Sequence, residues 1–73
     1  MMKLKYDPEA DALYIKLVEG DHEVRTINLT DEIALDFASG EVLVGIEILD
    51  AKEVIGKGDL PKVVLENLQL ETS

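Results

Sequence analysis

Two carboxylates in one apolar stretch are the residues whose types and spacing first suggest chemistry. Asp36 and Glu47 lie within residues 33–49, IALDFASGEVLVGIEIL, which alternates with the period of a β-hairpin. Paired carboxylates act as acid and base when their carboxyl groups lie about 5–9.5 Å apart. A two-residue turn at Ser39-Gly40 sets Asp36 against Leu43, about 13 Å along the strand from Glu47. We therefore expect no catalytic pair here.

Metal-binding patterns are equally incomplete. His22 is the only histidine and the chain has no cysteine, so nothing completes a site around it. Asp7, Glu9 and Asp11 have a spacing similar to that of a calcium loop. They lack its glycine at the sixth position and its distal glutamate, and Pro8 stiffens the segment. We expect neither a bound metal nor a cofactor.

Nucleophile and phosphate-loop motifs are also missing. Ser39 is a turn residue without a nucleophile-elbow pattern. Residues 56–58, Gly-Lys-Gly, lack Walker spacing, and Asp59 adds a repelling charge. The sequence therefore predicts a non-enzymatic protein.

The predicted hairpin has a definite register. The Ser39-Gly40 turn places Ala38 opposite Glu41, because glycine accepts the positive φ of a tight turn. The apolar cross-strand pairs are then Phe37 with Val42, Leu35 with Val44, and Ile33 with Ile46. These pairs share one face and are expected to be core.

The other face of the hairpin is mixed and supplies the candidate interaction surface. Gly45 leaves a gap on it where a partner or another backbone can come close. Tyr14, Val18, Leu43 and Leu49 would form an apolar patch there with a charged rim, as at protein interfaces. Coverage of this patch by the C-terminal segment is the alternative. The predicted interaction residues are Tyr14, Lys16, Asp36, Leu43, Gly45 and Glu47.

Taken in order, the chain predicts a single α+β domain over residues 1–73. Alternating segments 2–6, 12–18, 22–29 and the two arms of 33–49 indicate a five-stranded antiparallel meander over residues 1–50. A single sheet must bury its apolar face. We expect residues 51–73, helical or extended, to cover it, or else a second subunit.

The helical signals lie just after the last strand. Asp50 and Glu53 have capping-box spacing, and Gly56 and Gly58 predict an early end to the helix they open. Leu60-Pro61 can open a second helix. The alternative is an extended segment that includes Val63, Val64, Leu65, Leu68 and Leu70.

At this point the motifs resemble a known family. Residues 6–15, YDPEADALYI, then Leu35-Asp36-Phe37 and residues 45–51, GIEILDA, are similar to the small prokaryotic family called domain of unknown function 2283. The resemblance implies a short, stand-alone β-rich protein. It implies no activity, cofactor or catalytic residue.

The charge of the chain limits the kinds of partner that it can bind. The formal net charge is −9, and residues 19–50 hold nine acidic residues against Arg25 alone. Such a field disfavours direct nucleic-acid binding and suits a basic protein. Without cysteine, a signal-peptide pattern or an apolar membrane span, we expect a cytoplasmic protein. The predicted function is binding to a protein partner or self-association, in one version antitoxin-like. A small ligand-binding protein or enzyme using Tyr14, Asp36 and Glu47 is the alternative.

Overall fold

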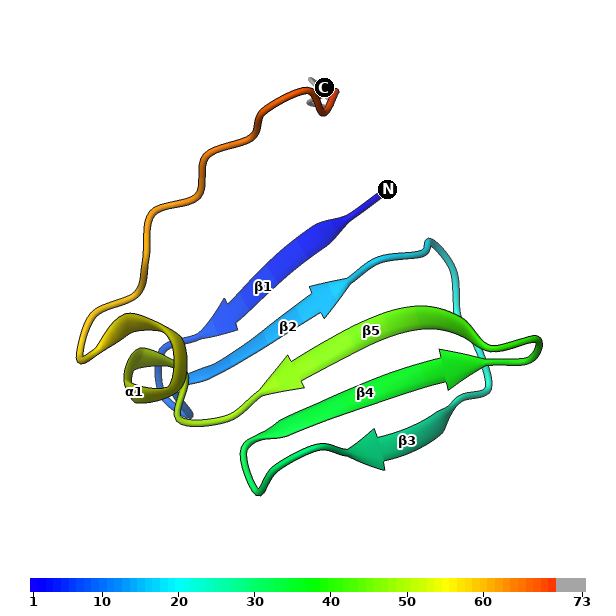
Figure 1. The fold of residues 1–73 in the computed structure, drawn as a ribbon, viewed down its shortest axis with the longest axis horizontal. Coiled ribbons are helices and arrows are strands. Elements are labelled where there is room, and N and C mark those ends of the chain that lie inside the picture. Colours follow the sequence, from blue (N-terminus) through cyan, green and yellow to red (C-terminus); the bar gives the residue numbers. More distant parts are fainter. Residues whose placement is uncertain (70–73) are drawn as a thin grey trace.

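The computed structural model describes residues 1–69. One antiparallel sheet of five strands and one short helix make up the regular structure (Figure 1). The predicted α+β fold class is confirmed. The elements are β1 (Lys3–Asp7), β2 (Ala12–Lys16), β3 (Arg25–Asn28), β4 (Ile33–Ala38), β5 (Val42–Ile48) and α1 (Ala51–Gly56).

The strand order differs from the sequential order of a simple meander. It runs β1-β2-β5-β4-β3, so β2 lies beside β5 rather than β3. The connection between β2 and β3 carries the chain past the ends of β5 and β4 to the far edge of the sheet (Figure 1). This arrangement puts the longest strand, β5, in the centre, where neighbours shield it on both sides.

The predicted register of the β4–β5 hairpin is wrong. Leu35 pairs with Ile46, and Ile33 with Ile48, each two residues further along β5 than we expected. The turn has three residues instead of two, because Gly40 and Glu41 both adopt positive φ (81° and 60°) and Ala38 pairs with Val42.

A β-bulge makes up the remaining difference in register. The pairing shifts between Asp36, which faces Gly45, and Phe37, which faces Leu43. Val44 is therefore the extra residue on β5.

The register gives the sheet two unlike faces. We call one the apolar face; its central row crosses all five strands as Leu4, Ile15, Ile46, Leu35 and Ile27, and a second row contains Tyr6, Leu13, Ile48 and Ile33. We call the other the polar face. Its rows are Lys5, Tyr14, Glu47, Ala34 and Asn28, and Lys3, Lys16, Gly45, Asp36 and Thr26.

Helix α1 forms without the predicted capping box. Asp50 has a left-handed conformation (φ 52°) and makes no side-chain capping bond. The Asp11 carboxylate, from the β1–β2 turn, accepts a hydrogen bond from the Lys52 N–H at 3.3 Å instead, and the Asp11 carbonyl accepts one from the Ala51 N–H at 2.9 Å. The early end at Gly56 is as predicted.

The second helix, expected from Leu60-Pro61, does not form. Residues 59–69 contain neither helix nor strand. They run outside β1 and cross neither face of the sheet in Figure 1. Val63, Val64 and Leu68 are more than 60% exposed. Leu70, part of the predicted extended alternative, lies outside the described residues. The expected cover of the apolar face is therefore not supplied by residues 59–69.

Very little of the chain is buried. Among residues 1–69 the buried apolar residues are Val44, Ile48 and Ala51. Two of them, Ile48 and Ala51, lie where β5 leads into α1, and Figure 1 shows the helix at that end of the sheet. The middle of the apolar face thus has no layer of described residues above it.

Candidate functional site

A carboxylate that accepts two hydroxyl groups forms the centre of the polar face. The Asp36 Oδ2 atom accepts a hydrogen bond from the Tyr14 hydroxyl at 3.1 Å, and Oδ1 accepts one from the Thr26 hydroxyl at 2.6 Å. Tyr14 comes from β2, Asp36 from β4 and Thr26 from β3. Tyr14 can reach Asp36 because the strand order puts only β5 between them.

Gly45 makes this contact possible. It pairs with both Lys16 and Asp36, and the Tyr14 ring crosses directly above it. A Cβ atom at position 45 would lie 2.6 Å from Tyr14 Cζ and closer still to the hydroxyl oxygen. The gap predicted at Gly45 is thus filled by Tyr14 from the same chain.

The β2–β3 connection borders a shallow hollow beside these residues. Its volume is about 190 Å³, and Tyr14, Lys16, Asp36, His22 and Val44 contribute to its lining. Burial and the Asp36 hydrogen bond raise the pKa of Tyr14. The hydroxyl therefore stays protonated near neutral pH, as a hydrogen-bond donor rather than a base. The hollow offers Lys16 as a cation and a fixed carboxylate to a small polar molecule.

The predicted interaction residues divide between the two faces. Tyr14, Lys16, Asp36, Gly45 and Glu47 share the polar face in two adjacent rows. Leu43 pairs with Phe37 and lies on the apolar face, because the bulge at Val44 changes the alternation. The apolar patch predicted around Tyr14 and Leu43 is therefore not formed.

The predicted separation of Asp36 and Glu47 is also wrong. Asp36 on β4 faces Gly45 on β5, and Glu47 lies two residues after Gly45 on β5. Asp36 and Glu47 are therefore diagonal neighbours on adjacent strands, about 7–8 Å apart. Both oxygens of Asp36 are engaged by hydroxyl groups, which turns the carboxylate toward Tyr14 and Thr26. The separation therefore no longer argues against a carboxylate pair. The hydrogen bonds to both Asp36 oxygens instead assign this carboxylate to fixing side chains on the face.

The family-like YDPEADA segment has structural contacts throughout. Asp7 accepts hydrogen bonds from the N–H groups of Glu9 and Ala10, which closes the β1–β2 turn. Asp11 accepts one from the Tyr6 hydroxyl at 2.7 Å besides capping α1. That hydrogen bond is the main cause that raises the pKa of Tyr6 to about 12.

The two outer motifs of the resemblance therefore meet in space. Asp11 of the first motif holds the start of the helix that follows the second.

His22 contacts the Glu19 carbonyl oxygen at 2.7 Å. In the part of the chain that the structure describes, no three histidine, cysteine or acidic residues group as metal ligands would.

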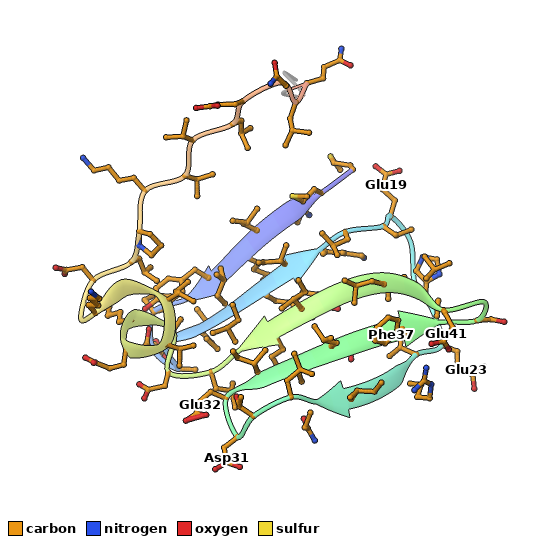
Figure 2. The ribbon with its side chains drawn as sticks, viewed as in Figure 1. Glu19, Glu23, Asp31, Glu32, Phe37 and Glu41 are labelled. Atoms are coloured by element: carbon orange, nitrogen blue, oxygen red, sulfur yellow. The ribbon has the colours of Figure 1, made fainter. Side chains whose placement is uncertain are left out.

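The apolar face is the candidate surface that sequence reasoning assigned to the core. Its central row runs from Leu4 on one edge strand to Ile27 on the other. Acidic groups lie outside the row. Figure 2 shows Glu23 and Glu41 at one end of β4, and Asp31 and Glu32 at the other. One sequence signal was available: the glycines and proline of residues 56–61 leave little helix to act as a cover.

Comparison with protein families gives one match. The model described as Protein of unknown function (DUF2283) matches residues 3–52, which include all five strands. Comparison with curated proteins and with solved structures finds no match. Within residues 1–69, no helix is both long and apolar enough to cross a membrane.

Proposed function

We propose that this chain, which belongs to the family described as Protein of unknown function (DUF2283), is a non-enzymatic protein-interaction module that binds through its apolar face. The observation that carries the proposal is the continuous apolar row across all five strands, from Leu4 to Ile27, with no second layer of described residues above its middle. A single sheet reaches a stable state by burying such a face.

Partial exposure of apolar side chains supports this choice of face. Ile48, beside α1, is its buried member at 7% exposure. On the apolar face, Ile15, Leu35 and Ile46 are only half-buried, and Leu4 is 46% exposed. A contiguous apolar patch that remains open on a small protein marks an interaction site.

Two classes of protein occupant fit this surface. One is a second copy of the chain. The other is a basic protein whose cations meet the acidic strand ends, in the manner of an antitoxin that neutralises a basic partner. The net charge of −9 favours a basic partner and disfavours nucleic acid.

A matched pair of exposed apolar residues tests the proposal. Leu4 on the apolar face and Val42 on the polar face are each 46% exposed, so either can become lysine without burying the new charge. Leu4→Lys is expected to weaken self-association or partner binding at least about 30-fold, the effect of losing a binding hot spot. Val42→Lys adds the same charge and is expected to change self-association or partner binding little. Equal effects of the two substitutions would contradict the proposal.

A small-ligand site on the polar face is the second candidate, supported by the Tyr14–Asp36–Thr26 hydrogen bonds and the adjoining hollow. The residues assigned to it are Tyr14, Lys16, Asp36, Gly45 and Glu47. Thermal-shift measurements with metal ions and metabolites test it. A ligand whose stabilisation is lost in Asp36→Asn supports this candidate, and the absence of any stabilising ligand counts against it.

A further inference from the structure

We infer that the occupant of the apolar face is a second copy of this chain, packed sheet against sheet about a two-fold axis near Ile46. This inference rests on the proposed function. An isologous interface places the same patch on both partners, so the patch must complement itself. A row of five aliphatic side chains (Leu4, Ile15, Ile46, Leu35 and Ile27) does so.

The middle of the apolar face favours an apolar occupant over a charged one. The central row contains no ionic group that could pair with the cations of a basic protein. Arg25, which pairs with Phe37 on β4, forms an ion pair with Glu41 at 2.7 Å and stacks on the Phe37 ring. The acidic residues at the two ends of β4 lie at the rim, where water solvates them when two sheets pack.

The chain exposes more area than a compact monomer of its mass. It exposes 5877 Å², whereas a folded monomer of this 8.1 kDa mass exposes about 4,500 Å². The excess of roughly 1,400 Å² includes the extended segment after the helix, so it is an upper bound on what the open face adds, and a standard interface takes about 800 Å² from each partner.

The geometry of sheet packing predicts which residues meet. β5 is the central strand, and Ile46 is the central member of the apolar row. Sheets that pack face to face lie about 10 Å apart. A two-fold axis through the middle of the face then sets Ile46 opposite its own copy. The next residue, Glu47, points to the other side of the sheet and away from the partner.

The chain has no cysteine, so single introduced thiols report this geometry without background. Ile46→Cys and Glu47→Cys are prepared in the full-length chain and treated with a bis-maleimide that spans about 10 Å, the spacing of packed sheets. Light scattering gives the mass of each variant and of the unmodified chain. We expect twice the 8.1 kDa chain mass for all three, and cross-linked dimer from Ile46→Cys alone.

Three outcomes would overturn the inference. The first is a dimer that cross-links through position 47 and not 46. The second is a monomer at every concentration whose face binds another protein in a manner that Leu4→Lys abolishes; the proposed function then stands without self-association. The third is a monomer whose thiol at position 46 resists maleimide, which means that its own chain covers the face and both proposals fail.

Discussion

The Tyr14 hydroxyl donates a hydrogen bond to the Asp36 carboxylate, at 3.1 Å, across the strand that separates them. The residue beneath the ring is Gly45. Three strands are thus joined on the polar face by a contact that depends on strand order, on register and on a missing side chain.

Gly45→Ala is therefore expected to destabilise the protein by about 1–3 kcal/mol, the usual cost of inserting a methyl group into an occupied space. Alanine would otherwise be favoured over glycine in a strand by roughly 0.5–1 kcal/mol. Urea unfolding of the variant shows whether the substitution lowers or raises the free energy of unfolding. In a Tyr14→Ala background the space is empty, and Gly45→Ala is expected to be neutral or stabilising there. The same loss in both backgrounds would contradict the contact.

Asp11, and not Asp50, is expected to hold the start of α1. Both residues have left-handed backbones (φ 50° and 52°), so glycine relieves a similar strain at either position. Asp11→Gly also removes the hydrogen bonds to Tyr6 and Lys52, and it is expected to cost a net of about 1 kcal/mol, as for a lost helix cap. Asp50→Gly is expected to be neutral or stabilising. Urea unfolding that ranks the two variants in reverse would refute the assignment.

The raised pKa values of the two tyrosines predict that the protein loses stability at alkaline pH. The pKa of Tyr6 is raised to about 12 in the folded chain, mainly by its hydrogen bond to Asp11, and that of Tyr14 is raised mainly by burial. Above about pH 10, where an unfolded tyrosine ionises, the folded state holds more protons than the unfolded state, so stability falls as pH rises toward about 12.

Phenolate absorbance follows this directly, because the chain has two tyrosines and no tryptophan. Tyr6→Phe is expected to leave one titrating group and a shallower loss of stability in alkali. Asp11→Asn is expected to lower the pKa of Tyr6 toward the usual value near 10, since the charged acceptor is gone. A Tyr6 titration unchanged in Asp11→Asn would contradict the hydrogen bond.

A dimer formed through the apolar face is expected to tighten as salt is added. Each chain carries a net charge of −9, so added ions screen the repulsion between two copies. A basic partner held by the acidic strand ends would show the opposite dependence. Sedimentation equilibrium at low and physiological ionic strength distinguishes the two. A dimer that dissociates on addition of salt would contradict apolar self-association.

Local patterns in the sequence predicted the strands but not their neighbours. Alternation located β1, β2 and the β4–β5 hairpin to within about two residues of their observed ends, because the period of a strand is a local property. Pairing of β2 with β5 depends on a connection that passes two other strands, and no short-range pattern encodes that path.

The predicted register of the β4–β5 hairpin was wrong for a related reason. The left-handed Glu41 lengthens the turn by one residue and the bulge at Val44 inserts another, and both leave the apolar alternation outwardly intact. Glycine within a strand often marks a bulge, so Gly45 was the available signal. These two residues decide that Leu43 lies on the apolar face and Val42 on the polar face.

The solution mass of the unmodified full-length chain tests the central claim most directly. Light scattering across a wide range of concentrations at physiological ionic strength is expected to give twice the 8.1 kDa chain mass, falling to 8.1 kDa only on strong dilution or in Leu4→Lys. A mass of 8.1 kDa at every concentration, unchanged by Leu4→Lys, would contradict self-association through the apolar face.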